Sequence, residues 1–229
     1  MSPQFKNIIC DVDGTLIDSA LDVLNAQLWM IHHYGFTHLT MDDIIPHFGK
    51  PIHEMMENIF PQEEHHRIPE SVEKYRNRYK ERWFETTTPF PHVASTVEKL
   101  HSRGVRFATA TTKTSDTTKI ILEHFGIAKY FSSIQGTDKG MPYKPNPFII
   151  EKILSAQHWK QEETIIIGDS EMDIQVGKNA GIAMCGVTYG SLSREQMVQW
   201  SPDFVIDSFA ELIKIIFAAE NAAVTTSLL

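Results

Sequence analysis

The stretch NIICDVDGTLIDS, residues 7–19, predicts a buried β-strand that ends directly before two carboxylates, Asp11 and Asp13. Side chains two residues apart on a strand point to the same side, so both acids leave the strand in one direction. Gly14 then allows the backbone to turn sharply. Like charges this close repel each other unless a cation or a proton balances them, but Asp residues at such a junction can also simply accept hydrogen bonds from backbone amides. This stretch alone leaves both interpretations open.

The composition predicts a soluble protein that binds neither nucleic acid nor membranes. The chain has 229 residues, 42% of them hydrophobic and 22% charged, which is ordinary for a globular protein. A net charge of -8 and a pI near 5.7, without a strong cluster of basic residues, argue against a nucleic-acid interface. No apolar run approaches the ~18 residues of a membrane helix, and no signal-peptide pattern precedes Asp11. Cys10 and Cys185 form no zinc or disulfide pattern, so we expect a cytoplasmic protein.

Helical periodicity follows the first strand, which is expected over residues 5–10. Four segments with this periodicity or with helix-forming composition fill residues 18–86, beginning with the apolar spacing of Leu21, Leu24, Leu28 and Ile31. The proline-containing segment TTTPFPHV then predicts a linker. The chain therefore has a helical block, residues 18–86, inserted between the first strand, residues 1–17, and the remainder, residues 87–229.

Predicted helices and strands alternate after the linker, which indicates an α/β fold with a parallel sheet and helices on both faces. Asn146 and Pro147 have the residue types of a helix start, and Ser208 with Glu211 has the pattern of a capping box. Helices are expected over residues 94–103, 115–125, 147–157, 171–180 and from 208, with strands over 105–111, near 134, and over 164–169, 182–188 and 204–207. We expect the tail after Ala218 to fray.

Three of the predicted strands end in polar residues, namely Asp11 with Asp13, Thr111, and Asp169. Ligands of open parallel sheets bind beyond the carboxyl ends of the strands, so these side chains meet in one crevice if the strands are neighbours. Three carboxylates are the oxygen ligands of a hard cation such as Mg²⁺. Lys144 lies in a loop between two prolines and can supply a fixed positive charge to the same crevice.

Each of these residues also has an ordinary explanation. Thr111 can be a β-branched strand residue, and Lys144 a solvated loop lysine. Asp169 and Asp173 can be acids at a helix N-terminus, where the helix dipole favours them. These separate explanations do not account for the joint occurrence of the four residues at strand ends, in this order along the chain.

These segments resemble the motifs of the haloacid dehalogenase-like hydrolases, in particular the phosphoglycolate-phosphatase-like branch, over nearly the whole chain. DVDGTLIDS is similar to the first motif of that family, TATTK to the second, KPNP to the third and GDSEMDIQVGKNAG to the fourth. The resemblance implies a Rossmann-like core, residues 1–17 and 87–229, with an inserted all-helical cap domain, residues 18–86. Two positions depart from the family pattern, because Thr112 stands where Asn is usual and His92 where Gly is usual.

The resemblance also implies a role for each site residue. Asp11 is the expected nucleophile that forms an aspartyl-phosphate, and Asp13 the general acid and base. Thr111 and Lys144 are expected to bind the phosphoryl oxygens. Mg²⁺ is expected to be held by the Asp11 carboxylate, the Asp13 backbone carbonyl and Asp169. The remaining assignments are Asp173 as support for Lys144 or the metal, and Gly14, Thr15, Lys50 and Thr112 as substrate-binding residues.

We therefore predict a Mg²⁺-dependent phosphatase of a small phosphorylated metabolite, with phosphoglycolate as the leading substrate by resemblance. Asp13 favours phosphoryl transfer over dehalogenation, because dehalogenase relatives lack the second acid. A phosphomutase or pyrophosphatase of the same superfamily, or a non-catalytic phosphate-binding regulatory protein, is the alternative. We expect a monomer or a homodimer. For Lys50 an exposed lysine beside a turn is an equally good interpretation.

Overall fold

The computed structural model describes residues 3–218 and divides into two compact units. One unit comprises Met1–Leu16 with Pro89–Leu229, and the other comprises Ile17–Thr88. The boundaries expected from the sequence, after residues 17 and 86, lie one and two residues from these junctions. The role of the second unit as a cap over a catalytic crevice stays a prediction.

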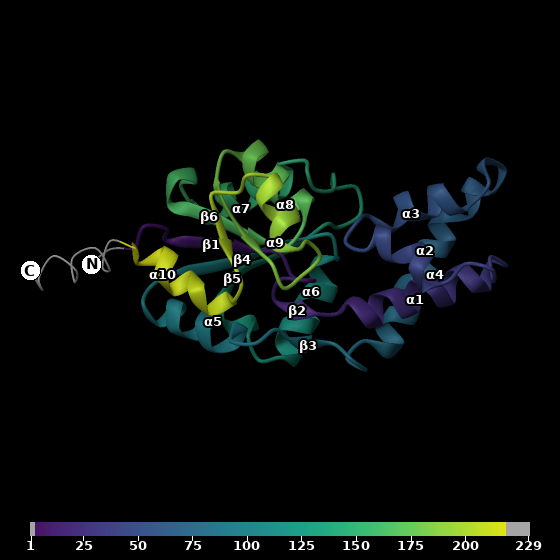
Figure 1. The fold of residues 1–229 in the computed structure, drawn as a ribbon, viewed down its shortest axis with the longest axis horizontal. Coiled ribbons are helices and arrows are strands. Elements are labelled where there is room, and N and C mark those ends of the chain that lie inside the picture. The colour runs from purple at the N-terminus through teal and green to yellow at the C-terminus, as the bar shows by residue number, and fades with distance from the viewer. Residues whose placement is uncertain (1–2, 219–229) are drawn as a thin grey trace, which may run out of the picture. The chain divides into compact units, whose positions relative to one another are not determined.

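A six-stranded parallel sheet forms the centre of the first unit (Figure 1). The predicted alternation of strands and helices is therefore confirmed as an α/β, Rossmann-like core. In spatial order the strands are β5 (Phe131–Gly136), β4 (Arg106–Thr111), β1 (Asn7–Cys10), β6 (Thr164–Gly168), β7 (Ala183–Val187) and β8 (Phe204–Ile206).

Helices cover both faces of this sheet (Figure 1). Ile9 and Ile166 of the central strands pack in one apolar cluster with Ile150 and Ile174 from the two helices on one face. All residues of β1 and β6 are buried, because helices cover each strand from both sides. The helices are α7 (Phe148–Gln157) and α8 (Glu171–Ala180) on this face, α5 (Val93–Ser102) and α10 (Leu212–Ile216) on the other, and α6 (Ser115–His124) and α9 (Arg194–Gln199).

The register of the sheet brings three strand ends together. Cys10, the last residue of β1, lies opposite Thr109 of β4 on one side and Ile167 of β6 on the other. Because parallel strands end at the same edge, the residues that follow these positions emerge next to one another. The condition for a shared crevice, that the strands preceding Asp11, Thr111 and Asp169 are neighbours, is therefore met.

The second unit contains mostly helices and has its own apolar core, which includes Met30, Met55, Met56 and Ile68. Its helices are α1 (Ala20–His33), α2 (Met41–Ile44), α3 (Ile52–Ile59) and α4 (Ile68–Arg82), with short 3₁₀ segments η1 (Ile45–His47) and η2 (Gln62–Arg67). Two short strands, β2 (Ile17–Asp18) and β3 (Thr88–Pro89), pair with each other near the two junctions. The sequence predicted only a helix start and a linker there, since two-residue strands have no periodic signal.

Local signals account for most helix ends of the core. A capping box of Ser170 with Asp173 starts α8, and Gly181, with a φ of 66°, ends it in the left-handed conformation. The capping box predicted at Ser208 is present, although it opens a 3₁₀ turn, η5 (Phe209–Glu211), before α10. The sequence missed α9, whose six residues are too few for a periodic pattern. The predicted fraying after Ala218 lies outside the described residues.

Two further predictions concern residues 146 and 92. The helix start predicted at Asn146 and Pro147 is one residue early, because α7 begins at Phe148 with Pro147 in the N-cap position. The Asn146 side-chain oxygen still accepts a hydrogen bond from the amide of Phe148 at 3.0 Å, since an Asn side chain readily bonds to the backbone two residues on. His92 precedes α5 with a φ of 68°. This left-handed conformation is the physical reason to expect Gly there. Two short 3₁₀ turns, η3 (Ala128–Tyr130) and η4 (Gln161–Glu163), complete the core, and no helix in residues 3–218 has the length and apolar character to cross a membrane.

Candidate active site

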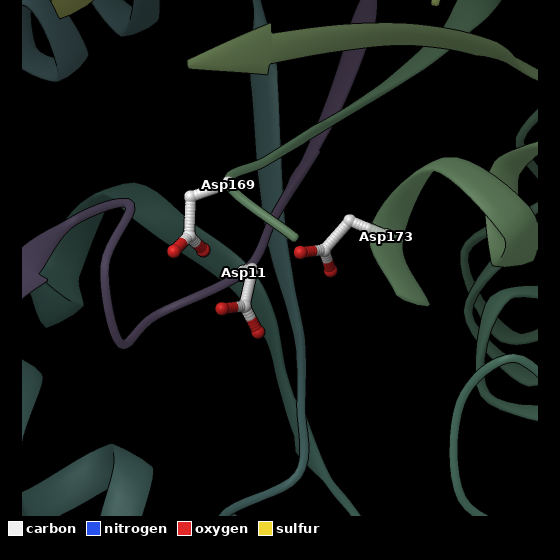
Figure 2. A group of neighbouring side chains, drawn as sticks. All are labelled: Asp11, Asp169 and Asp173. Carbon is white, nitrogen blue, oxygen red and sulfur yellow. The ribbon is translucent and has the colours of Figure 1, made fainter. Parts of the chain in front are cut away.

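Three buried carboxylates meet where β1 and β6 end (Figure 2). Asp11 follows β1, Asp169 follows β6, and Asp173 lies in the first turn of α8. One carboxylate oxygen from each residue lies within 4.8 Å of the others. Asp11 and Asp169 are the acids expected from the sequence, while Asp173 was assigned only a supporting role. We call these three residues the acid cluster.

Lys144 is the cation of the acid cluster. Its ammonium nitrogen donates hydrogen bonds to Asp11 Oδ1 at 2.7 Å and to Asp173 Oδ1 at 2.6 Å, and a third to the carbonyl of Ala110 at 3.1 Å. Only 3% of the lysine side chain is exposed, so its position is determined by these partners. The loop that precedes α7 thus delivers a fixed positive charge to the strand ends.

The charges of the cluster do not balance. Burial, together with the charges of Asp173 and Asp169, raises the pKa of Asp11 well above its usual range, although Lys144 opposes this. Burial and the neighbouring Asp173 raise the pKa of Asp169 to about 6. Burial lowers the pKa of Lys144, but Asp11 and Asp173 outweigh that effect and raise it above its ordinary value. Three carboxylates and one lysine leave an excess of negative charge that a cation or a proton must compensate.

Asp169 is held by the loops on either side of it. Ser191 donates from its backbone amide at 2.7 Å and from its hydroxyl at 2.6 Å, and the Thr15 hydroxyl donates at 3.1 Å. Glycine is required on both loops at this point, because a Cβ on Gly14 would lie 2.1 Å from Asp169 Oδ2 and one on Gly190 would lie 2.3 Å from the Gly14 carbonyl oxygen. Gly14 also has a φ of 75°. Thr15 and Gly14 therefore contact Asp169, and their expected contact with substrate stays a prediction.

Asp13 is placed differently from the sequence expectation. Its carboxylate does not belong to the acid cluster but forms an ion pair with Lys113 at 3.1 Å. The chain leaves the strand conformation after Cys10 and turns at Gly14, so strand alternation does not govern the direction of Asp13. Asp11 and Asp13 are thus each paired with a different lysine.

The remaining predicted residues have the following positions. Thr111 is the last residue of β4, and its hydroxyl accepts a hydrogen bond from the amide of Lys113 at 3.3 Å. Thr112 comes next and is partly exposed. Lys50 is exposed in the turn between η1 and α3 of the helical unit.

Comparison with known proteins identifies the family of this chain. A model of the family described as haloacid dehalogenase-like hydrolase matches residues 8–187 of the chain. The chain belongs to this family. It is 31% identical over 213 residues to pyrophosphatase PpaX of Halalkalibacterium halodurans, a match that covers 93% of this chain and 97% of the relative. It is also 31% identical over 220 residues to phosphoglycolate phosphatase of Vibrio parahaemolyticus, with 93% and 96% covered.

Solved structures show the same fold. A haloacid dehalogenase-like family hydrolase from Streptococcus pneumoniae superposes on this hydrolase with a TM-score of 0.82, at 24% identity. The match covers 92% of this chain and 97% of the other. The shared fold therefore includes both the parallel sheet and the inserted helical segment of the sequence.

The residues of this hydrolase fit a magnesium ion. The acid cluster offers only oxygen ligands and carries excess negative charge, which is the donor set that a hard divalent cation prefers. The hydroxyl and amide bonds to Asp169 fix its carboxylate, as hydrogen bonds to metal ligands generally do.

Sequence reasoning missed two residues of the site, Lys113 and Ser191. Lys113 lies within the quoted segment TATTK, but a lysine after a strand has no distinguishing pattern. Ser191 lies in the loop after β7, where serine and glycine are ordinary turn residues. Only the sheet order, which places this loop beside β6, reveals the contact of Ser191 with Asp169.

Proposed function

We propose that this hydrolase is a Mg²⁺-dependent phosphatase of small phosphorylated metabolites. The observation that carries the proposal is the buried Asp11 carboxylate at the end of β1, held by Lys144 within a cluster of excess negative charge. Such a carboxylate is positioned to act as a nucleophile only when positive charge is close enough to accept an anionic substrate.

Asp11, Asp169 and the backbone carbonyl of Asp13 would hold the metal. A bound Mg²⁺ supplies positive charge that offsets the negative charges of the carboxylates and the phosphoryl group. Asp173 keeps Lys144 oriented through its 2.6 Å hydrogen bond. Mg²⁺ and Lys144 would together neutralise the negative charge of the three acids, and this explains why the acids can be buried side by side.

The reaction consists of two displacements on phosphorus. In the first, an Asp11 oxygen bonds to phosphorus while the bond to the leaving oxygen breaks, and Asp13 gives its proton to that oxygen. In the second, Asp13 takes a proton from water, the water oxygen attacks phosphorus, and the bond to Asp11 breaks to release phosphate. Lys144 and Thr111 hold the phosphoryl oxygens through both displacements.

Phosphoglycolate is the leading substrate, supported by the 31% identical phosphoglycolate phosphatase. Pyrophosphate is the second candidate, because an equally similar relative is named a pyrophosphatase. We propose that the helical unit selects between these substrates and that Lys50 is its contact to the substrate. Lys50→Ala should then lower kcat/KM of the preferred substrate and change the ranking of a substrate panel, whereas Lys80→Ala on the same unit should not.

The decisive experiment measures phosphate release from phosphoglycolate and pyrophosphate with Mg²⁺ and with excess chelator. We expect turnover only with Mg²⁺, and a loss of at least ~10⁴-fold in Asp11→Asn, as for other removed nucleophiles. Asp116→Asn, an exposed acid on α6, is the matched control and should keep full activity. Circular dichroism checks that each variant is folded.

Unchanged phosphate release in Asp11→Asn, or full activity in chelator, would overturn the proposal. Turnover that yields an isomeric phosphoester instead of inorganic phosphate would identify a phosphomutase. Binding of phosphate without turnover of any panel member would identify the regulatory alternative.

A further inference from the structure

Lys113 is a second lysine of the site that the proposed mechanism does not use. It follows β4 by two residues, and its ammonium nitrogen lies 3.1 Å from Asp13 Oδ2. Its side chain is only 9% exposed and that of Asp13 is 13% exposed. A lysine this buried is uncommon, because desolvation of its charge is costly unless a partner compensates it.

The backbone of Lys113 is fixed in place. Its amide donates to the Thr111 hydroxyl at 3.3 Å, and its carbonyl accepts from the amide of Thr137 at 2.8 Å. Gly136 allows this close approach, since a Cβ there would lie 2.1 Å from the Lys113 carbonyl oxygen. The lysine therefore extends from a rigid base beside the end of β4, which is the preorganisation that a binding contact requires.

The position of Asp13 defines what Lys113 can reach. A general acid must lie within about 3 Å of the oxygen that it protonates. Adding this to the 3.1 Å ion pair places the leaving oxygen within about 6 Å of the Lys113 nitrogen when it sits near Asp13 Oδ2. Substituents next to that oxygen, such as a carboxylate or a second phosphate, then come within hydrogen-bond distance after a small movement of the flexible lysine side chain.

We propose that Lys113 binds a negatively charged group on the leaving part of the substrate. This inference rests on the proposed function and deepens it, because it restricts the substrates to phosphoesters or anhydrides whose leaving group is itself an anion. The transferred phosphoryl group is held by Lys144 and Thr111, so a second anionic group needs a cation of its own. Lys113 supplies this charge beside the general acid, where the leaving group departs.

A purely positioning role for Lys113 is the competing explanation. If the lysine only orients Asp13, its removal impairs protonation to the same extent for leaving groups of equal basicity, whatever their charge. If the lysine binds the leaving group, its removal affects charged leaving groups more than uncharged ones. The ratio of kcat/KM between two substrates that differ only in this charge separates the two roles.

The test compares phosphoglycolate with phosphoglycolamide, in which an uncharged amide replaces the carboxylate. The wild-type protein should favour phosphoglycolate, and Lys113→Met should reduce this preference by about 10-fold or more, as expected for a lost hydrogen bond between charged groups. Lys113→Arg, which keeps the charge, should retain most of the preference. Lys119→Met, an exposed lysine on α6 that pairs with Glu123, is the matched control and should change nothing.

Pyrophosphate and phenyl phosphate provide a second comparison in the same variants, with a charged and an uncharged leaving group. A preference that stays unchanged in Lys113→Met in both comparisons overturns the inference, whether the absolute rates fall or not. A wild-type protein without any preference for the charged leaving groups overturns it as well. A wild-type protein that turns over none of the four compounds overturns the proposed function, and this inference with it.

Discussion

Two buried carboxylate sites of this hydrolase have opposite electrostatics. The acid cluster has one lysine for three carboxylates, and this lysine, Lys144, pairs with Asp11 and Asp173. In the helical unit, Asp22 accepts hydrogen bonds from four donors, the backbone amides and hydroxyls of Thr86 and Thr87, at 2.6 to 3.1 Å. The first site has one cationic partner for three carboxylates, while the second has four donors for one carboxylate.

The pKa values follow this difference. Burial raises the pKa of Asp22, but the hydrogen bonds from Thr87 and Thr86 outweigh burial and lower it below its ordinary value. For Asp169 the bonds from Ser191 and Thr15 do not outweigh burial and Asp173, and its pKa is raised to about 6. Burial of a carboxylate is therefore not by itself a sign of function. An excess of buried acids over cationic partners is the feature that indicates a cation site.

Removal of the lysine should have the largest effect on the acid cluster. In Lys144→Met the three acids lose their cation, so we expect a rate loss of ~10²-fold or more and, in chelator, a loss of unfolding free energy of ~3–5 kcal/mol. Mg²⁺ should restore part of the stability. Enzyme assays and urea unfolding measure both, with the exposed Lys99→Met as control. Unaltered stability in chelator would show that the acids do not depend on this lysine.

The two sites should also respond to pH with opposite signs. The raised pKa of Asp169 means that the folded protein binds the proton of this carboxyl more tightly than the unfolded chain does. The contribution of this proton to the unfolding free energy is present near pH 4 and is lost as pH rises through about 6. In chelator, the unfolding free energy of Asp169→Asn relative to that of the wild type should rise by on the order of 2–3 kcal/mol between pH 4 and pH 7. Urea unfolding at both pH values measures this gain, and a constant difference would contradict it.

Asp22 should contribute stability and not catalysis. Replacing it by Asn removes the charge that four donors share, so we expect a loss of ~2 kcal/mol of unfolding free energy at pH 7. Because the pKa of Asp22 is lowered in the folded protein, this loss should persist above pH 4 and shrink as pH falls further. The Mg²⁺ concentration for half-maximal activity should not change. A shift in that concentration would remove the distinction between the two sites.

The smallest effect is expected for Ser191→Ala. This change removes one of three donors to Asp169 and leaves the backbone amide of residue 191 in place. The affinity for Mg²⁺ should fall by ~10-fold, as for other groups that orient metal ligands. Titration calorimetry with Mg²⁺ provides the measurement, and Ser95→Ala on the exposed start of α5 is the control. An unchanged affinity would mean that the hydrogen bond from the Ser191 hydroxyl to Asp169 does not contribute to metal binding.

Much of the fold was predictable because its signals are local. The alternation of apolar strands with amphipathic helices predicted the parallel sheet. The capping box expected at Ser208 is present, and the helix expected over residues 171–180 has these bounds. The two-residue strands β2 and β3 and the short helix α9 were missed. Elements this short have too few residues to show a period, and pairing partners or neighbouring loops decide whether they form.

The sequence by itself determined that Asp11 and Asp169 each follow directly on a buried strand, because hydrophobic period and strand ends are properties of contiguous residues. The tertiary structure decided that these two strands are neighbours. Only the tertiary structure decided which lysine meets which acid. Lys144 reaches Asp11 across 133 residues of sequence, and the donors to Asp22 begin 64 residues after it. These pairings depend on the order of the strands in the sheet and on where the chain returns after the helical unit. Neither can be recognised from the residues next to the acid. For the same reason, a buried acid that is fully satisfied and one that needs a metal are indistinguishable until their partners are placed.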